Sequence, residues 1–417
     1  MIEAAIIEWG GLLIRWVHII TGIAWIGASF YFMHLDAAIR ATPDMPPEQG
    51  GEAWEVHGGG FYQVRKFLVA PEFLPDHLIW HKWQAYTTWI TGFFLLVWIY
   101  YLSADLYLID PAVMAMSPWV AAGLGMAGLA AGWLIYDQLC KSGLGANDTH
   151  LSIACFALVV AAAYGFQSVF SGRGALIHTG AFMATIMSAN VFFVIIPNQK
   201  VVVADLIAGR APDPALGEQA KQRSAHNNYL TLPVLFLMLS GHYPLTFSTP
   251  YAFVIVALVL IAGALIRVYF NHRNAGKGEL WWTWAVAAVC LAAAAAISLS
   301  STPLGRQALA IAPKIDGGVP MQTAAAPDEI TDIVAGRCSM CHARQTSYPL
   351  VGMAPNGLLL DTPEAVARHA QSIYLHSVLT TAMPPNNVSG MTLAERRQIA
   401  AWVEGRGVEG QDREGAE

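Results

Sequence analysis

Eight apolar runs of about 20 residues each follow one another through roughly the first 300 residues of the chain. A run of this length is what an α-helix needs to cross the hydrocarbon layer of a bilayer. Inside lipid a helix satisfies all of its own backbone hydrogen bonds, whereas an open strand does not. We therefore predict an all-α fold whose first part is an eight-helix transmembrane bundle, with spans at 11–33, 83–103, 117–136, 150–170, 177–197, 228–246, 250–270 and 281–301.

The composition agrees with a protein that lives in a lipid bilayer. Of the 417 residues, 55% are hydrophobic and 12% are charged, whereas a soluble domain carries about 25% charged residues. The net charge of -6 gives no indication of a nucleic-acid partner. The N-terminal "MIEAAIIEWGG" lacks a positively charged region, so we expect the first run to be retained as a span rather than removed as a signal peptide.

Lysine and arginine are concentrated in alternate loops, which predicts the orientation of the bundle. The loop 34–82 and the loops after the fifth and seventh spans are basic, whereas 104–116 and 247–249 contain no Lys or Arg. We expect the basic loops to be cytoplasmic. The predicted location is therefore the bacterial inner membrane, multi-pass, with both termini and residues 302–417 on the periplasmic side.

The organisation changes after the last span. Residues 302–327 are rich in Pro, Ala and Gly and are typical of a linker. Residues 328–408 show helical patterns near 328–340, 363–380 and 393–405, with helix-start signals at Thr362-Pro363 and a capping box from Thr392 to Glu395. We predict a small all-α domain there, after the transmembrane domain 1–301, with a flexible tail at 409–417.

This C-terminal domain contains the spacing of a covalently attached c-type haem. Cys338 and Cys341 are followed directly by His342, the C-x-x-C-H pattern, so the thiols can bond the porphyrin while the imidazole ligates the iron. Met383, in "TTAMPPNN", is the expected sixth ligand, and Met353 and Met391 are its competitors. A His/Met pair raises the reduction potential and suits an electron acceptor. A zinc site is the alternative, but no second Cys or His pair follows at zinc spacing.

Histidines fall at two depths of the predicted bundle. Ionisable residues inside spans are costly and therefore indicate function, although histidines at helix ends also sit in the headgroup region without a specific role. The functional interpretation is a b-type haem held by paired histidines, or a substrate pocket lined by them, and His18 is the deepest of these residues. The periplasmic-side layer contains His18, His178 and His242, and the cytoplasmic-side layer contains His34, His81, His150, His226 and His272.

The first loop is the other unusual segment. Arg65 follows three glycines at 58–60 and several aromatic residues, and it would be able to clamp a planar anion in a bidentate fashion. The alternative is an interfacial segment anchored by Trp and Lys. As candidate catalytic or substrate-binding residues we therefore name Arg65, His81, His150 and His226, with the histidines as proton acceptors.

The first span "IRWVHIITGIAWIGASFYFMHLD", the loop "HGGGFYQVRKF" and the eight-span domain with a C-terminal cytochrome c module resemble the membrane-bound bacterial urate oxidase (urate hydroxylase) family. The resemblance implies oxidation of urate to 5-hydroxyisourate in purine degradation. Electrons would pass to the tethered haem c and on to a downstream periplasmic or membrane acceptor of the respiratory chain. Urate yields two electrons and haem c accepts one at a time, so a haem b relay near His18 is a further expectation.

A protein of another class would show some of the same features. A membrane-anchored cytochrome c subunit that oxidises quinol would need no substrate site of its own, and it would leave the Gly-Arg-aromatic loop unexplained. A transporter with a redox sensor would not explain the linker. Reduction of haem c by urate distinguishes the first interpretation from both of these.

Overall fold

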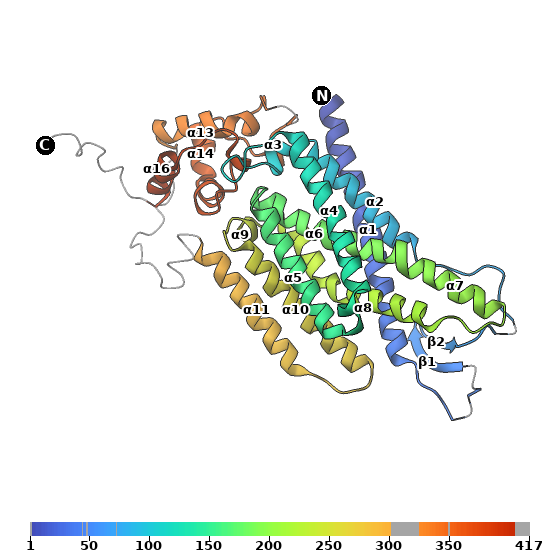
Figure 1. Ribbon diagram of the computed structural model, residues 1–417. Helices are drawn as coiled ribbons and strands as arrows, with labels where there is room; N and C mark the ends of the chain where they lie inside the picture. The colour runs from blue at the N-terminus through green and yellow to red at the C-terminus, as the bar shows by residue number, and fades with distance from the viewer. Residues whose placement is uncertain are drawn as a thin grey trace.

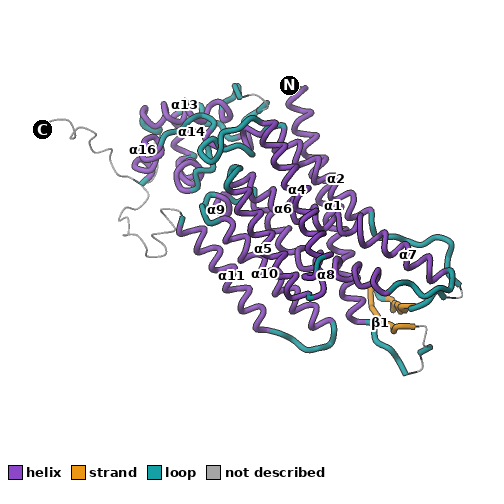
Figure 2. The backbone as a smooth tube through the Cα atoms, viewed as in Figure 1, coloured by secondary structure: helices purple, strands orange, loops and turns teal. Residues whose placement is uncertain are grey.

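The computed structural model describes residues 2–43, 45–46, 49–71, 73–301, 325–348 and 351–404. Most of the predicted linker and the whole of the predicted tail, 409–417, lie outside these ranges. Within them, long helices run side by side and a smaller helical domain lies at one end of this bundle (Figure 1). The colouring by secondary structure shows that strands are confined to one small hairpin at the opposite end (Figure 2).

A helix lies at each of the eight positions predicted from the apolar runs. In the described part of the chain, six helical segments are long and apolar enough to cross a membrane: Trp9–Ala38, Pro118–Lys141, Asp148–Gln167, Gly172–Ile207, Ala252–Asn274 and Trp281–Ser300. That the other two also cross remains a prediction. The helices are α1 (Ile2–Ala38), α2 (Trp83–Leu95) with the π-helical η1 (Leu96–Tyr101), α4 (Pro118–Lys141), α5 (Asp148–Gln167), α6 (Gly172–Ala189) with the π-helical η3 (Asn190–Ile195) and α7 (Ile196–Ile207), α8 (Pro214–Ser240), α10 (Ala252–Asn274) and α11 (Trp281–Ser300).

Helix α8 differs most from its prediction, which placed it at 228–246. It starts at Pro214, where the side chain of Asp213 accepts a hydrogen bond from the backbone N–H of Ala215, and it ends at Ser240. The apolar run did not indicate the first half of this helix, because Arg223, Asn227 and neighbouring polar residues lower its mean hydropathy. Arg223 and Asn227 are buried by other helices, so the segment is helical without being uniformly apolar.

Small residues allow the helices to pack closely, as is common in membrane bundles. A Cβ atom on Gly132 of α4 would lie 2.1 Å from the ring of Phe182 on α6. Likewise, a Cβ on Gly263 of α10 would lie 2.7 Å from Cδ of Pro233, the proline inside α8. The main core therefore lies where α4, α5, α6, α8 and α10 meet.

The expectation of an all-α fold is wrong for the first loop, which contains an antiparallel hairpin. Strands β1 (Gln49–His57) and β2 (Gly60–Phe67) pair with each other, and Gly58 and Gly59 form the two-residue turn with φ of 58° and 80°. Positive φ at both turn positions is the requirement of a tight hairpin, which glycine meets without strain. The glycines thus shape the turn. An ion pair of 2.8 Å between Lys66 and Asp36 ties the hairpin to the end of α1.

The C-terminal domain is all-α, as predicted. Its helices are α13 (Asp328–His342), α14 (Pro363–Arg368), α15 (Ala370–Ile373) with the π-helical η5 (Tyr374–Leu379), and α16 (Leu393–Val403). The capping box of Thr392 and Glu395 is confirmed, as is Thr362 as N-cap. This domain and the N-terminus lie at the same end of the bundle (Figure 1). There the short helix α3 (Ala104–Tyr107) contacts the 3₁₀ turn η6 (Pro385–Asn387).

Candidate functional site

A cavity of about 560 Å³ opens between α1, the segment before α2, the η3–α7 helix and α8. We name it the His81 cavity. Its polar wall is formed by His81, Gln199, Ser224 and Asn227, together with Asp36 and Ser29 of α1. Its apolar wall is largely aromatic and includes Trp25, Phe32 and Trp80. A mainly apolar pocket with a few converging polar groups is the usual form of a small-molecule site.

His81 is held against this wall by an aromatic contact. Its ring lies edge-on to Phe32, with 4.8 Å between the ring centroids. Phe32 comes from α1 and His81 from the segment that precedes α2, so the contact closes one side of the cavity. His81 thus lines this cavity, and its role in a substrate site stays a prediction.

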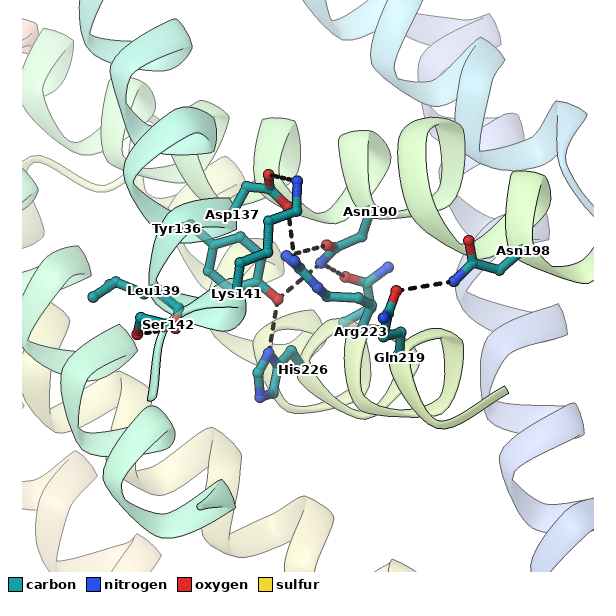
Figure 3. A network of polar contacts seen from close by, with 11 residues as sticks. Tyr136, Asp137, Leu139, Lys141, Ser142, Asn190, Asn198, Gln219, Arg223 and His226 are labelled. Carbon is teal, nitrogen blue, oxygen red and sulfur yellow. Dashed lines mark hydrogen bonds and ion pairs between the residues drawn. The ribbon is translucent and has the colours of Figure 1, made fainter. Parts of the chain in front are cut away.

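A buried polar network joins Tyr136, Asn190 and His226 (Figure 3). The amide nitrogen of Asn190 donates hydrogen bonds to Oδ1 of Asn227 over 2.9 Å and to the hydroxyl of Tyr136 over 3.1 Å. The Tyr136 hydroxyl in turn lies 2.7 Å from Nδ1 of His226. Since the tyrosine oxygen already accepts from Asn190, its own proton is available for His226. These contacts join α4, the start of η3 and α8 in one chain of hydrogen bonds.

The network also contains buried charges. Arg223 is 3% exposed and its Nη2 lies 2.7 Å from Oδ1 of Asp137, whose other oxygen lies 2.6 Å from Nζ of Lys141. Nη1 of Arg223 donates to Oδ1 of Asn190 over 3.3 Å. Asp137 thus accepts from the buried guanidinium of Arg223 and from the exposed ammonium of Lys141, and Arg223 polarises the Asn190 amide that donates to Asn227. Buried charges of this kind persist only when they are paired and hydrogen-bonded.

A π-helical turn positions Asn190. Residues 172–207 form one continuous helical segment, and Asn190 is the first residue of the π-helical turn η3 inside it. Such turns are rare and occur frequently at functional sites. Val191 and Ile195 of the same turn line the His81 cavity. The π-helical turn therefore contributes Val191 and Ile195 to the cavity wall and Asn190 to the polar network.

A second cavity, of about 250 Å³, lies toward the end of the bundle near the C-terminal domain. We name it the His18 cavity. His18 lines it from α1, and its Nδ1 lies 3.0 Å from the carbonyl oxygen of Thr88. The other charged or titratable side chains of its wall are Arg15, Arg173 and His242, and its aromatic side chains are Trp25, Trp89, Phe93 and Tyr100.

One helix serves both cavities. Residues of α1 at helical spacing line the His18 cavity at Arg15 and His18, and the His81 cavity at Ser29 and Phe32. Trp25 lies between these pairs in the sequence and lines both cavities. The two cavities are therefore neighbours separated at this point by one indole ring.

The remaining predicted residues lie elsewhere. Arg65 is half-exposed on β2, where its Nε lies 3.4 Å from Glu52, and it does not line the His81 cavity. His150 is exposed in the first turn of α5. His178 is fully buried, with Nδ1 2.8 Å from the Gly174 carbonyl and Nε2 3.2 Å from the Tyr101 hydroxyl, and it lines neither cavity.

Sequence reasoning missed the amides and carboxylate of the network. Asn190 and Asn227 lie in or beside apolar runs. Arg223 was counted among the basic residues of the loop after the fifth span, and Asp137 lies just past the end of the third predicted span. A signal was present, because uncharged amides within membrane spans also cost free energy unless they are paired. In the prediction from sequence, this cost was taken as an indication of function for histidines alone.

A comparison with protein families identifies the membrane part. The family model described as "Urate oxidase N-terminal" matches residues 4–298. The chain belongs to this urate oxidase family. The match covers both cavities and the polar network, and it points to a urate-related function for this part of the chain. No match was found among curated proteins or among solved structures.

The C-terminal domain lies beyond the stretch matched by the urate oxidase family model. Cys338, Cys341 and His342 are on the last turns of α13, and Nδ1 of His342 lies 3.1 Å from the Leu358 carbonyl oxygen. A carbonyl only accepts, so Nδ1 carries the proton and Nε2 keeps its lone pair, the arrangement typical of a metal-ligating histidine. Burial raises the pKa of the Cys338 thiol to about 11. The thiols and the imidazole thus fit a covalently attached haem.

The three methionines considered as sixth ligand differ in their surroundings. Met391 is 3% exposed and is part of the domain core, whereas Met353 is 63% exposed. Met383 is 38% exposed in the loop after η5, where its N–H donates to the His376 carbonyl over 2.8 Å and Arg396 donates to its carbonyl oxygen over 3.0 Å. Its backbone is therefore fixed while its side chain remains accessible, which keeps Met383 as the predicted ligand.

Proposed function

We propose that this member of the urate oxidase family is a membrane-bound enzyme that oxidises urate to 5-hydroxyisourate in the His81 cavity. The electrons pass to a haem c in the C-terminal domain and from there to the respiratory chain. The observation that carries the proposal is the position of Asn227, which joins the cavity wall to a buried polar network within the family-matched region.

The hydrogen-bonding capacity of Asn227 suits the edge of a urate ring. Its Nδ2 donates to the Met187 carbonyl over 2.9 Å, and its Oδ1 accepts from Asn190. A side-chain amide has two N–H donors and two acceptor lone pairs, so one of each remains. The edges of urate alternate N–H and C=O groups, and an amide is complementary to such a pair. Gln199, which also lines the cavity, offers a second amide.

The shape and charge of the cavity also favour urate. Trp25, Phe32 and Trp80 line it, and aromatic faces stack on flat heterocycles. Urate at neutral pH is a monoanion. Arg223 donates to Asn190, and Asn190 donates to Asn227, so this chain of hydrogen bonds directs donors toward the cavity, where an anion is favoured.

The reaction balances with water as the oxygen source. The urate monoanion and one water molecule give neutral 5-hydroxyisourate, one proton and two electrons. The titratable side chains in the cavity wall are His81 and Asp36, and Asp36 is paired with Lys66 over 2.8 Å. We therefore assign His81 the role of accepting the proton that the attacking water gives up. Asn227 and the aromatic rings hold the substrate while this happens.

The residues that would hold haem c are Cys338 and Cys341 through thioether bonds, and His342 and Met383 as iron ligands. The group supplies a one-electron acceptor of raised potential. The hydrogen bond from Nδ1 of His342 to the Leu358 carbonyl keeps Nε2 free of a proton. The hydrogen bond from Arg396 to the Met383 carbonyl fixes the backbone of the second ligand.

Anaerobic mixing of the purified full chain with urate tests the proposal. We expect the c-type absorption band of the reduced form to appear in a stopped-flow record, with 5-hydroxyisourate as the product. The Asn227→Ala variant should slow this reduction while reduction by dithionite stays unchanged. Reduction by a quinol but not by urate would instead assign the chain to electron transfer from quinol and would contradict the proposal.

A further inference from the structure

The His18 cavity combines groups that urate oxidation in the His81 cavity does not use. It joins two imidazoles, of His18 and His242, and two guanidiniums to a wall with several aromatic side chains. We propose that this cavity binds a b-type haem, with His18 as an iron ligand and with Arg15 and Arg173 paired to the two propionates. The assignment of the cavity stands on its own geometry, and its role as an electron relay rests on the proposed function.

The hydrogen bonds of His18 leave the correct nitrogen for iron. Nδ1 lies 3.0 Å from the Thr88 carbonyl oxygen and 3.1 Å from the Thr91 hydroxyl. The Thr91 hydroxyl proton is directed to backbone carbonyls of α2, so Nδ1 of His18 is the donor to both oxygens. Its Nε2 therefore keeps a lone pair. A metal-binding histidine almost always has its other nitrogen anchored in this way.

Gly92 makes room for this imidazole against α2. A Cβ atom at residue 92 would lie 2.9 Å from Cε1 of His18, closer than real Cβ atoms approach. Gly92 also lines the cavity. The glycine thus allows the His18 ring to pack closely against α2 at the cavity wall.

The arginines of this cavity have no carboxylate partner in the described part of the chain. Arg173 stacks over the ring of Tyr107, with its guanidinium carbon 4.7 Å from the ring centroid, and its Nε is buried without a hydrogen-bond partner. A buried cationic donor of this kind costs free energy unless an anion binds it. Carboxylates pair with arginine in a bidentate fashion, as haem propionates would.

The depth of these groups matches the polarity of haem. Arg15 precedes His18 by one turn of α1, roughly 4.5 Å along the axis, toward the end that carries the C-terminal domain. Arg173 begins α6 and His242 follows α8 at that same end. The iron ligand is thus deeper than the cations, and the aromatic wall lies around it, as a flat macrocycle with two charged groups on one edge requires.

The position of the His18 cavity suits a bound haem to the role of an electron relay. Trp25 separates it from the His81 cavity. On its other side Arg173 stacks on Tyr107 of α3, and α3 contacts the turn 385–387 that closely follows Met383. The His18 cavity therefore lies between the proposed urate site and the proposed haem c ligand, where a one-electron relay is needed.

Optical analysis of the purified full chain tests the assignment without use of urate. Pyridine haemochrome spectra should show one b-type and one c-type haem per chain. His18→Ala should lose the b-type band and keep the c-type band, whereas His150→Ala, at an exposed histidine outside the cavity, should keep both. Gly92→Ala provides a second variant that keeps the ligand and should weaken haem b retention roughly tenfold or more.

The outcomes separate this inference from the proposed function. A wild-type spectrum with c-type haem alone would overturn the inference, and extraction of a stoichiometric quinone in its place would assign the cavity to that ligand. Retention of the b band in His18→Ala would also overturn it. If the b band is present and is lost in His18→Ala while urate reduces neither haem, the haem b site stands and the urate proposal fails.

Discussion

Asn190 donates a hydrogen bond to the side-chain oxygen of Asn227 over 2.9 Å, and this contact joins the buried charges to the wall of the His81 cavity. Through it, a residue on a π-helical turn fixes which face of the Asn227 amide is left for a ligand. The remaining donor and acceptor are therefore oriented before any ligand binds. Such preorganisation is what gives a polar site its discrimination.

Asn227→Ala is predicted to lower kcat/KM for urate by about 10- to 100-fold, because one donor and one acceptor in a buried site are lost. Steady-state oxidation of urate measures it. Asn198→Ala is the matched control, since Asn198 bonds to the Leu216 carbonyl and to Gln219 and does not line the cavity. Equal losses in both variants would contradict a direct role for Asn227.

Asp137→Asn is predicted to destabilise the fold by about 3–5 kcal/mol, because it leaves the buried Arg223 guanidinium without its counter-charge. Thermal unfolding in detergent measures the change. Asp205→Asn offers a matched control, since its 2.6 Å pair with Arg210 is at the surface and should contribute about 0–1 kcal/mol.

A double variant refines this test. Asp137→Asn combined with Arg223→Gln removes both buried charges, and it should be less destabilised than the sum of the two single variants. Additive losses would mean that the two side chains act independently in the fold.

Met383→Ala is predicted to keep the covalent haem c but to lower its reduction potential, because the thioether ligand that raises the potential is removed. Redox titration of the c-type band measures the shift. Met353→Ala changes a side chain that is 63% exposed and should leave the potential unchanged. The opposite pattern would make Met353 the ligand.

Glu395 is predicted to make the C-terminal domain sensitive to acid. The backbone N–H of Thr392, followed by Arg337, lowers the pKa of Glu395 below 4.5. A carboxyl group with a lowered pKa stabilises the fold at pH values above its ordinary pKa, and this contribution is lost as pH falls through the lowered value.

Amide hydrogen exchange of α16 in the full chain checks this expectation. Protection in the wild type should decrease as the pH is lowered below about 4.5, after correction for the intrinsic exchange rate. Glu395→Gln should show lower protection at neutral pH and a weaker pH dependence. Identical profiles for the two proteins would contradict the role of this carboxylate.

The apolar runs predicted where the helices lie because burial in lipid imposes one requirement on a whole segment. The polar network was not predictable in this way, since Asp137 and Arg223 are far apart in sequence and meet only through packing of α4 against α8. His81 was named from its residue type alone, and its role in a substrate site remains a prediction although it lines the cavity. The contact of Arg65 with Glu52 was not predictable, because the sequence pattern did not indicate the hairpin that brings the two residues together.

Helix α1 is one unbroken element from Ile2 to Ala38. Because its residues form part of the wall of both cavities, the helix cannot slide or rotate at one cavity without doing so at the other. A ligand that shifted α1 at one cavity would therefore change the affinity of the neighbouring cavity, and thermodynamic linkage would make that influence equal in both directions. Ligand binding in the two cavities would then be coupled through the wall that they share.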